Sequence, residues 1–538
     1  MRATAGRSVA ETFAEAMHAF EAGQQAEARR LALRLAEAAP AFGGAHYLLG
    51  LIELERGHGR KAAGHLAQAI KITPGQVAPH LAMGRALEQG GDLAEACLHF
   101  RTVLDLAPGH AEAHARLGAL LARLGKAEEA IDHCRRAVAA SPDHAEAWNT
   151  LGGLLQQKGD NAEAVDCLQR ALALRPDWPA ALNNFGLALT ALGCFAQAAT
   201  ILEGAVALRP DHSGSRVNLA ASYRALGRLK DARRHAEKAT RLDGRSGAAW
   251  TELGLVRQAE AHPAAAAAAF ERAVATAPSD AAAWYCLAEA RRAEGDAARA
   301  ATAYGRCLAL DPEDRHGAAL GLALTGAAAT PDRAPEAYVR RLFDDYATRF
   351  DETLVDRLDY CAPALLADAL ARILPRPTDL EVLDAGCGTG LAAPVLRPLA
   401  RRLDGIDLSP AMVAKAAERR LYDHLAEGDL VAVLSERPAR YDLMVAADVL
   451  VYLGDLDPVF RAARHALRPG GHLAFTVEKA DDTNSYRLGP KHRYGHAAEY
   501  LRRLAEQNGF TVVVLEDAVT RRDGGADVPG LLAVLRAV

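Results

Sequence analysis

Aromatic residues are scarce in this sequence. They make up 5% of 538 residues, although 50% of the chain is hydrophobic. Small aliphatic side chains must therefore supply most of any core, which favours closely packed helices. Basic residues are not in excess either, since 63 Lys and Arg stand against 68 Asp and Glu. Without a long basic run, charge gives no support to nucleic-acid binding.

Cysteine pairs and long apolar runs are also lacking. The eight cysteines include no CxxC spacing, so we expect free thiols in a reducing compartment and no metal site. No stretch of 18 apolar residues occurs, and residues 1–24 lack the apolar segment of a signal peptide. We therefore expect a cytoplasmic protein that does not enter a membrane.

What the chain does have is a proline repeated every 34 residues, with Gly244 in the one gap of the series. The prolines are Pro40, Pro74, Pro108, Pro142, Pro176, Pro210, Pro278 and Pro312. A fixed period of this length is typical of repeat proteins built from helix pairs. The proline would end the second helix of each pair.

Two glycine series share this period. The first is Gly50, Gly84, Gly118, Gly152, Gly186 and Gly254, and the second is Gly57, Gly91, Gly125, Gly159, Gly193, Gly227 and Gly295. Together with an alanine that recurs from Ala62 to Ala300, the first series would let two antiparallel helices pack closely. The second series would end the first helix of each pair.

These marks resemble the tetratricopeptide repeat family. The resemblance implies an α-solenoid with eight regular units between residues 41 and 312 and a less regular one at about residues 7–40. A helix at about residues 314–324 would cap the stack, because terminal units need an altered outer face. We assign residues 1–326 to the repeats and residues 327–337, which break the helical pattern, to a linker.

A cluster of asparagines falls on the first helices of three units. Asn149 and Asn183 occupy equivalent positions, as do Asn184 and Asn218. In the resemblance, such amides line a groove and hold an extended peptide by its backbone, as in the repeat domain of the O-GlcNAc transferases. The alternative is ordinary polar residues on a solvated helix face. The repeats thus imply a protein or peptide partner.

The stretch from Leu380 to Gly390 reads LEVLDAGCGTG. A short apolar run precedes three glycines at alternate positions, Gly386, Gly388 and Gly390, which indicates a buried strand entering a turn that brings backbone close to a ligand. A helix beginning near Leu391 would point its N–H groups at a carboxylate. The dinucleotide spacing GxGxxG is not met. The alternative is an ordinary strand-to-helix turn.

Three more segments follow in order. Residues 403–409 indicate a second short strand ending at Asp407, residues 427–430 offer Asp429 at the end of a third unit, and the apolar run at residues 441–447 ends at Asp448. In this order the motifs resemble the class I S-adenosylmethionine-dependent methyltransferases over residues 338–538. The resemblance implies an α/β doubly wound (Rossmann-like) domain that binds S-adenosyl-L-methionine. The closing strands would lie at about residues 511–516 and 531–535.

By the resemblance, Asp407 accepts both ribose hydroxyls of the cofactor. Leu408 and Met412 pack on the adenine, and Asp429 with Leu430 recognises its edge. The whole implied set is Tyr346, Asp384, Gly386, Cys387, Gly388, Gly390, Asp407, Leu408, Met412, Asp429, Leu430 and Asp448. Tyr346 and Phe350 are candidate lid residues, or else core residues of an entry helix.

Methyl transfer depends mainly on alignment of the reacting groups, so a catalytic base is not required. If one exists, His496 and Tyr452 are the nearest candidates, and the alternative for His496 is a surface histidine at a helix start. The absence of an Asn/Asp-Pro-Pro-Tyr stretch argues against methylation of exocyclic or amide nitrogens, and the absence of a Pro-Cys pair argues against 5-methylcytosine chemistry. The acceptor is left open as a protein or a small molecule. Two functions remain: an active methyltransferase whose repeats recruit a protein, or an interaction scaffold that binds the cofactor without turnover.

Overall fold

The computed structural model describes residues 8–347, 350–351, 360–374, 379–481, 484–523 and 526–538. The chain forms two compact units, Met1–Arg228 and Leu229–Val538. No described helix combines the length and the hydropathy needed to cross a lipid bilayer.

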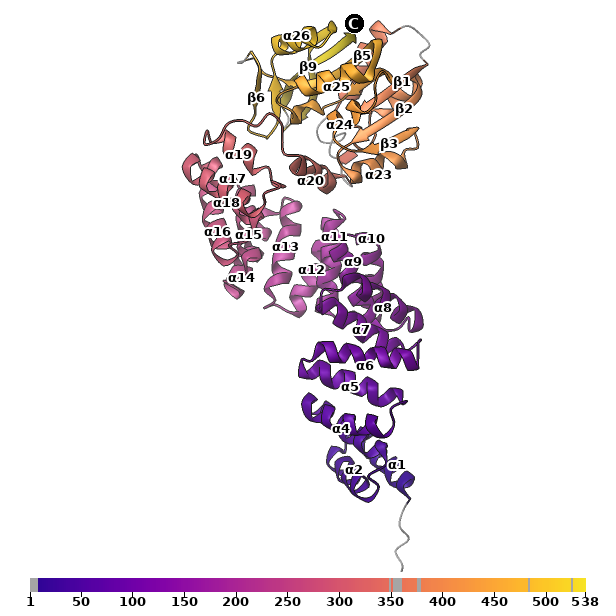
Figure 1. Cartoon of the computed structure of the whole chain (residues 1–538). Coiled ribbons are helices and arrows are strands. Elements are labelled where there is room, and N and C mark those ends of the chain that lie inside the picture. Colours follow the sequence, from indigo (N-terminus) through magenta and orange to yellow (C-terminus); the bar gives the residue numbers. More distant parts are fainter. Residues whose placement is uncertain (1–7, 348–349, 352–359, 375–378, 482–483, 524–525) are drawn as a thin grey trace, which may run out of the picture. The chain divides into compact units, whose positions relative to one another are not determined.

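The first unit is a row of helices of nearly equal length (Figure 1). They are α1 (Val9–Glu21), α2 (Gln25–Ala38), α3 (Gly43–Glu55), α4 (Gly59–Ile72), α5 (Val77–Gly90), α6 (Leu93–Leu106), α7 (Ala111–Arg123), α8 (Ala127–Ala140), α9 (Ala145–Lys158), α10 (Asn161–Leu174), α11 (Pro179–Ala191), α12 (Phe195–Leu208) and α13 (Ser213–Ala225). The second unit continues the pattern with α14 (Leu229–Leu242), α15 (Gly247–Ala259), α16 (Pro263–Thr276), α17 (Ala281–Glu294), α18 (Ala297–Leu310) and the short α19 (Ala318–Leu324). The predicted α-solenoid is confirmed.

The two glycine series have separate structural causes. A Cβ on Gly186 would lie 2.4 Å from Cγ of Leu202 on the next helix, and the other glycines of the first series face their second helices in the same way. The second series has positive φ, for example 78° at Gly193, where a side chain would be strained. At the equivalent place in one repeat stands Ala261, with φ of 58°.

The rest of the second unit is built on one sheet (Figure 1). Its strands are β1 (Leu380–Ala385), β2 (Ala400–Asp407), β3 (His424–Glu427), β4 (Tyr441–Ala446), β5 (Leu467–Lys479), β6 (Tyr486–Leu488), β7 (Tyr494–His496), β8 (Phe510–Asp523) and β9 (Ala526–Ala537). The order is β3-β2-β1-β4-β5-β7-β6, and β9 pairs antiparallel with both β5 and β8. Strands β1 to β5 are parallel to one another, as the predicted doubly wound domain requires.

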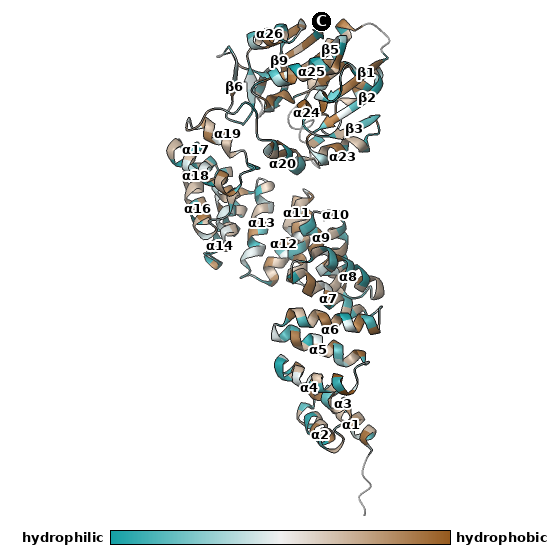
Figure 2. Cartoon of the chain, in the orientation of Figure 1, coloured by the Kyte–Doolittle hydropathy of each residue, from teal (hydrophilic) through white to brown (hydrophobic). Residues whose placement is uncertain are grey.

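Helices join these strands and cover the sheet. They are α20 (Glu336–Tyr346), α21 (Ala362–Ile373), α22 (Ala393–Leu396), α23 (Pro410–Glu418), α24 (Leu430–Ser435), α25 (Asp457–Ala466) and α26 (Ala498–Gln507), with 3₁₀ turns at Arg397–Leu399 and Leu450–Tyr452. Neighbouring residues of β1 enter different cores: Leu383 packs in a core with Phe460 of α25 and Leu501 of α26, and Val382 packs with Leu366 of α21. The sheet is therefore buried on both faces. In Figure 2 its strands alternate between hydrophobic and hydrophilic colours.

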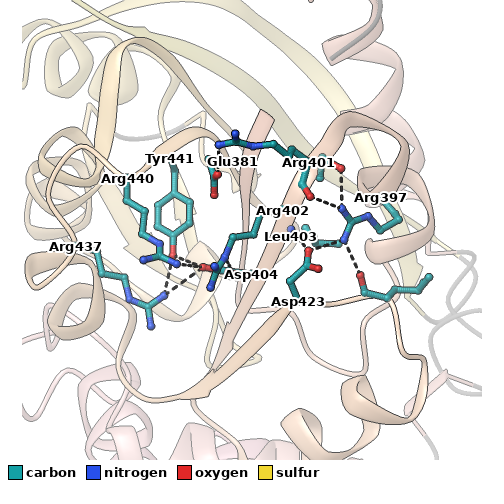
Figure 3. A network of polar contacts seen from close by, with 12 residues as sticks. Glu381, Arg397, Arg401, Arg402, Leu403, Asp404, Asp423, Arg437, Arg440 and Tyr441 are labelled. Atoms are coloured by element: carbon teal, nitrogen blue, oxygen red, sulfur yellow. Dashed lines mark hydrogen bonds and ion pairs between the residues drawn. The ribbon is translucent and has the colours of Figure 1, made fainter. Parts of the chain in front are cut away.

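A buried charge cluster fastens β2 to the start of β4 (Figure 3). Asp404 is fully buried, and its carboxylate accepts hydrogen bonds from Arg402 (2.8 Å), Arg440 (3.0 Å) and the Tyr441 hydroxyl (3.1 Å). Because every carboxylate oxygen has a charged or hydroxyl donor, the burial cost of this group is offset. Removing one partner would leave an uncompensated charge inside the sheet.

Three local expectations need adjustment. The helix after Gly390 is only the four-residue α22, because Pro398 in the 3₁₀ turn that follows has no N–H to continue the helical hydrogen bonds. The closing strands are longer than expected, since β8 and β9 pair along most of their length. The short hairpin of β6 and β7 is absent from the sequence prediction, and His496 lies in its second strand rather than at a helix start.

Candidate active site

A cavity of about 1120 Å³, counting its open mouth, lies at the carboxyl ends of four parallel strands. Gly386, Asp407, Gly428 and Ala447, which follow or end β1, β2, β3 and β4, all line it. In parallel α/β sheets the connections on either side of a topological switch point part here and leave a crevice for ligands.

The glycine loop after β1 forms one wall of this cavity. The φ angles of Gly386, Gly388 and Gly390 are 76°, 53° and 85°, all in the region that favours glycine. The amides of Gly386 and Cys387 both donate to the Ile406 carbonyl, at 2.8 and 2.9 Å. A Cβ on Gly386 would lie 2.4 Å from Val449, so only glycine lets this backbone approach the cavity.

Asp407 connects that loop to the end of β2. Its Oδ2 accepts the Gly388 amide at 2.8 Å and its Oδ1 accepts the Ser409 amide at 2.9 Å. Burial raises the pKa of Asp407, and these backbone donors oppose the rise. An ionised carboxylate has about four acceptor sites. About two therefore remain for hydroxyl donors in the cavity, which Asp407 lines.

Four residues of the implied cofactor set in or near the loop do not line the cavity: Asp384 in β1, Cys387 and Gly390 in the loop itself, and Met412 in α23. The buried Asp384 carboxylate accepts a 2.6 Å hydrogen bond from the Tyr422 hydroxyl. Burial raises the pKa of Asp384 to about 7, and the Tyr422 bond opposes this. Met412 is fully buried in the helix after β2. These four residues are therefore not part of the cavity wall.

After Asp407 along the chain, the next residues of the implied set that line the cavity are Leu408, Asp429 and Leu430. Asp429 caps α24 by accepting the Ala432 amide at 3.1 Å, and its second oxygen lies 3.2 Å from a guanidinium nitrogen of Arg333. No sequence motif points to Arg333, because it falls in the stretch assigned as a linker. That stretch in fact bonds to this unit, since the Ala334 amide donates to the Tyr452 carbonyl at 2.8 Å.

Asp448 lines the cavity at the end of β4, with φ of 60°. Both of its oxygens accept hydrogen bonds from Arg521 of β8, at 2.6 and 2.7 Å. Arg521 also bonds to Glu478 of β5 and is buried. A second arginine, Arg493, lines the cavity beside them. Neither arginine could be predicted from a motif, because both lie in segments that follow the glycine loop and the strand-end aspartates in the sequence.

The two candidate bases are placed differently. Tyr452 lines the cavity, where its ring lies against Phe343 with centroids 5.5 Å apart. Burial raises the pKa of its phenol. His496 is fully buried outside the cavity lining, 3.1 Å from the Gly454 carbonyl oxygen. Burial lowers the pKa of His496 to about 4, so this imidazole is neutral at ordinary pH.

The two candidate lid residues also separate. Phe350 lines the cavity and packs against Phe343, with ring centroids 5.9 Å apart. Tyr346, at the end of α20, is 44% exposed and does not line the cavity. Residues 348–349 and 352–359 of the same aromatic segment lie outside the described part of the chain.

In the first unit, the four asparagines form two hydrogen-bonded pairs. The Asn184 amide nitrogen donates to Asn149 at 3.3 Å, and that of Asn218 donates to Asn183 at 3.0 Å. Each pair joins the first helices of consecutive repeats, and all four side chains are half-buried. Part of their hydrogen-bonding capacity is thus used within the array.

Family models match both regions. A methyltransferase domain matches residues 358–515, and tetratricopeptide repeats match residues 13–77, 109–177, 149–213, 189–253 and 251–315. Human methyltransferase-like protein 27 is 30% identical over 187 residues, which are 34% of this chain and 69% of that protein. The chain belongs to the methyltransferase-domain family, with tetratricopeptide repeats before that domain.

Other relatives match over shorter stretches. Malonyl-[acyl-carrier protein] O-methyltransferase of Enterobacter lignolyticus (strain SCF1) is 35% identical over 115 residues, 21% of this chain and 45% of that protein. The chain thus spans less than half the length of this relative. Among solved structures, an S-adenosylmethionine-dependent methyltransferase from Mesorhizobium loti aligns over 31% of this chain and 96% of its own, with 21% identity and a TM-score of 0.26.

Proposed function

We propose that this protein is an S-adenosylmethionine-dependent methyltransferase whose repeats bind a protein. The observation that carries the proposal is Asp407, a buried carboxylate at the end of β2 that holds the glycine loop and keeps acceptor capacity toward the cavity. Such a carboxylate suits the paired hydroxyls of a ribose.

The residues of the cavity fit this cofactor. Gly386 and Gly388 line the cavity without side chains, and a Cβ on Gly388 would meet nothing closer than 3.6 Å, so the amino-acid end can approach the backbone there. Leu408 and Leu430 offer apolar surface to an adenine, and Asp429 can accept a hydrogen bond at its edge. S-adenosylmethionine supplies a methyl group that is already activated on sulfur. The protein then has to orient the acceptor and exclude water.

The experiment for this proposal is a calorimetric titration of the full chain with S-adenosylmethionine, with ATP and NAD as adenosine-containing controls. We expect binding of S-adenosylmethionine and none of the controls. The same protein with methyl-labelled cofactor and a cell extract should then transfer label to an acceptor. Binding without any transfer would favour the scaffold function, and equal binding of all three ligands would contradict the methyltransferase assignment.

The repeats support a role in protein recognition, and the paired asparagines are the candidate contacts. In the first unit Asn183 and Asn218 share one bond, so an extended peptide would compete for or bridge the remaining amide groups. Alanine at Asn183, Asn184 and Asn218 together should abolish partner capture in a pull-down. Alanine at the exposed Glu128, Asp132 and Gln157 is the control, because these side chains lie outside the asparagine pairs. Unchanged capture by the triple variant would remove the asparagines from the binding surface.

A further inference from the structure

The cavity has two chemically different ends. At the ends of β1, β2 and β3 it offers the glycine loop, Asp407 and Asp429, which the proposed function gives to the cofactor. Past β4 the sheet continues to β5 and β7, and here the cavity is lined by Asp448, Tyr452 and Arg493. This second end is left for the methyl acceptor.

Arg493 is held at that end by the β6–β7 hairpin. The Gly489 amide donates to the Arg493 carbonyl at 2.7 Å, and His492 before it is buried with φ of 60°. His492 packs edge-on against Tyr338, with ring centroids 6.0 Å apart. The Arg493 guanidinium lies over the Tyr452 ring, 5.7 Å from its centroid. Its backbone and its side-chain plane are therefore both constrained.

The carboxylates near Arg493 are bonded to another arginine. Asp448 and Glu478 accept hydrogen bonds from Arg521, which is only 3% exposed. Nη1 of Arg493 forms longer ion pairs with the same two carboxylates, 3.7 Å from Asp448 and 3.6 Å from Glu478, and the Arg493 side chain is 26% exposed. A guanidinium has five N–H donors, so Arg493 keeps donors for a ligand in the cavity that it lines.

At the same end, no described lining residue is suited to remove a proton. Tyr360 and the candidate base Tyr452 line the cavity, but burial raises the pKa of both phenols, so both keep their protons. None of the described residues that line the cavity is a histidine. Asp448 is held by Arg521, and Glu336 is bonded to Arg340 at 3.0 Å. The other lining carboxylates, Asp407 and Asp429, accept backbone amides. An acceptor that is already an anion at neutral pH would need no base.

We infer that the acceptor is a carboxylate and that Arg493 binds it. This rests on the proposed function, which it sharpens to carboxyl methylation. One carboxylate oxygen forms a bond to the methyl carbon while the carbon–sulfur bond breaks and its electron pair goes to sulfur. The products are a methyl ester and S-adenosylhomocysteine, and no proton has to be moved. The planar guanidinium can donate two parallel hydrogen bonds to a carboxylate, which fixes its orientation.

The test uses the alkali lability of methyl esters. The full chain is incubated with methyl-labelled S-adenosylmethionine and an extract of the cells that make it, and the products are treated with mild alkali. We expect label to be released as volatile methanol. Label that stays bound after alkali would mean an amine, thiol, carbon or ether acceptor and would overturn the inference while leaving the methyltransferase proposal intact. Cofactor binding without any transferred label would overturn both.

Arg493 is tested with three variants. Arg493→Gln should lower methanol release at least tenfold, chiefly by raising KM for the acceptor, while calorimetric affinity for S-adenosylmethionine stays within twofold of wild type. Arg493→Lys keeps the charge but lacks the planar pair of donors, so its methanol release should lie between those of wild type and Arg493→Gln. Arg461→Gln, which removes an exposed arginine on α25, should behave as wild type.

Thermal unfolding is recorded for each variant so that a folding defect is recognised. If Arg493→Gln unfolds at a lower temperature than wild type, the role of Arg493 is judged from Arg493→Lys instead. A raised KM for the acceptor at unchanged cofactor affinity in that variant still requires a role in acceptor binding. Wild-type KM in both Arg493 variants would overturn the assignment of this residue.

Discussion

The repeats and the sheet domain use their residues in opposite ways. In the repeats, one structural task recurs every 34 residues and different side chains perform it. The carbonyl at the end of the preceding repeat accepts a bond from Trp148 (2.9 Å), from His80 (3.0 Å) and from Arg216 (2.8 Å) at the equivalent position. In the sheet domain, Asp407 has no equivalent elsewhere in the chain. We therefore expect single substitutions to have small effects in the repeats and large effects in the sheet domain.

The largest effect is expected from Asp407→Ala. Loss of a charged acceptor for two backbone amides and for the cofactor should weaken S-adenosylmethionine binding by about a hundredfold or more, since each charge-assisted bond contributes about 1.5 to 3 kcal/mol. Calorimetry measures this directly. Asp517→Ala, at an exposed carboxylate paired with Lys479, is the control and should bind normally. Normal binding by Asp407→Ala would contradict the assigned site.

Smaller effects, of opposite sign, on the free energy of unfolding are expected when two glycines of one repeat are replaced by alanine. Gly186→Ala places a Cβ 2.4 Å from Leu202 and should lower the free energy of unfolding by about 1 to 3 kcal/mol through overpacking. Gly204→Ala, in α12, meets nothing closer than 3.8 Å and should raise it by about 0.5 to 1 kcal/mol through helix propensity. Chemical denaturation of both variants tests the pair. Equal shifts would show that close helix packing does not explain the first glycine series.

Histidine pairs distinguish three N-terminal repeats from the later ones. They are His46 with His65, His80 with His99, and His114 with His133. In the second pair the two Nδ1 atoms lie 3.1 Å apart, and Nε2 of His80 lies 3.0 Å from the Pro74 carbonyl oxygen. That carbonyl needs the proton on Nε2, so Nδ1 of His80 accepts from His99 in the neutral pair.

These pairs should make the N-terminal repeats less stable in acid. Burial and the facing histidine lower the pKa of His65, His99 and His133, while Glu53, Glu95 and Asp132 respectively oppose this. The unfolded chain then binds more protons, so stability is complete above the unfolded pKa of about 6.5 and is lost as pH falls below it. The unfolding midpoint in denaturant should therefore drop between about pH 7.5 and about pH 5.5.

The chain offers its own control for this effect, because Trp148 and Cys167 occupy the same two positions in a later repeat. Combining His80→Trp with His99→Cys should reduce the pH dependence, and the same change at His114 and His133 should reduce it further. A pH dependence that survives removal of all three pairs would assign it to other groups.

The smallest effect is expected from Ala261→Gly. Ala261 has φ of 58° where Gly227 and Gly295 have 72° and 89°, so glycine should relieve strain and raise stability by up to about 1 kcal/mol. Ala268→Gly, at an exposed position inside α16, should instead lower it by about 0.5 to 1 kcal/mol. Thermal unfolding followed by circular dichroism compares the two. Destabilisation by both would show that the left-handed residue carries no strain.

The sequence predicted most where a short segment contains the whole cause. The glycine loop could be placed because three alternate glycines after an apolar run specify a strand and a tight turn without help from distant residues. The placement of Met412 could not, because helix α23 turns that side chain into the core while Leu408 at its entrance lines the cavity. Tyr346 and Phe350 are four residues apart, as on one helical face, but Tyr346 is exposed and Phe350 lines the cavity.

By itself, the sequence determined the solenoid, the positions of the parallel strands along the chain and the aspartates at their ends. Periodicity and strand-end motifs are local, because they repeat or follow one another along the chain. Only the tertiary structure decided which charged groups meet. Arg493 and Arg521 reach Asp448 from segments 45 and 73 residues further on. The hairpin and the antiparallel strand that bring them there depend on sheet pairing, which no single segment specifies.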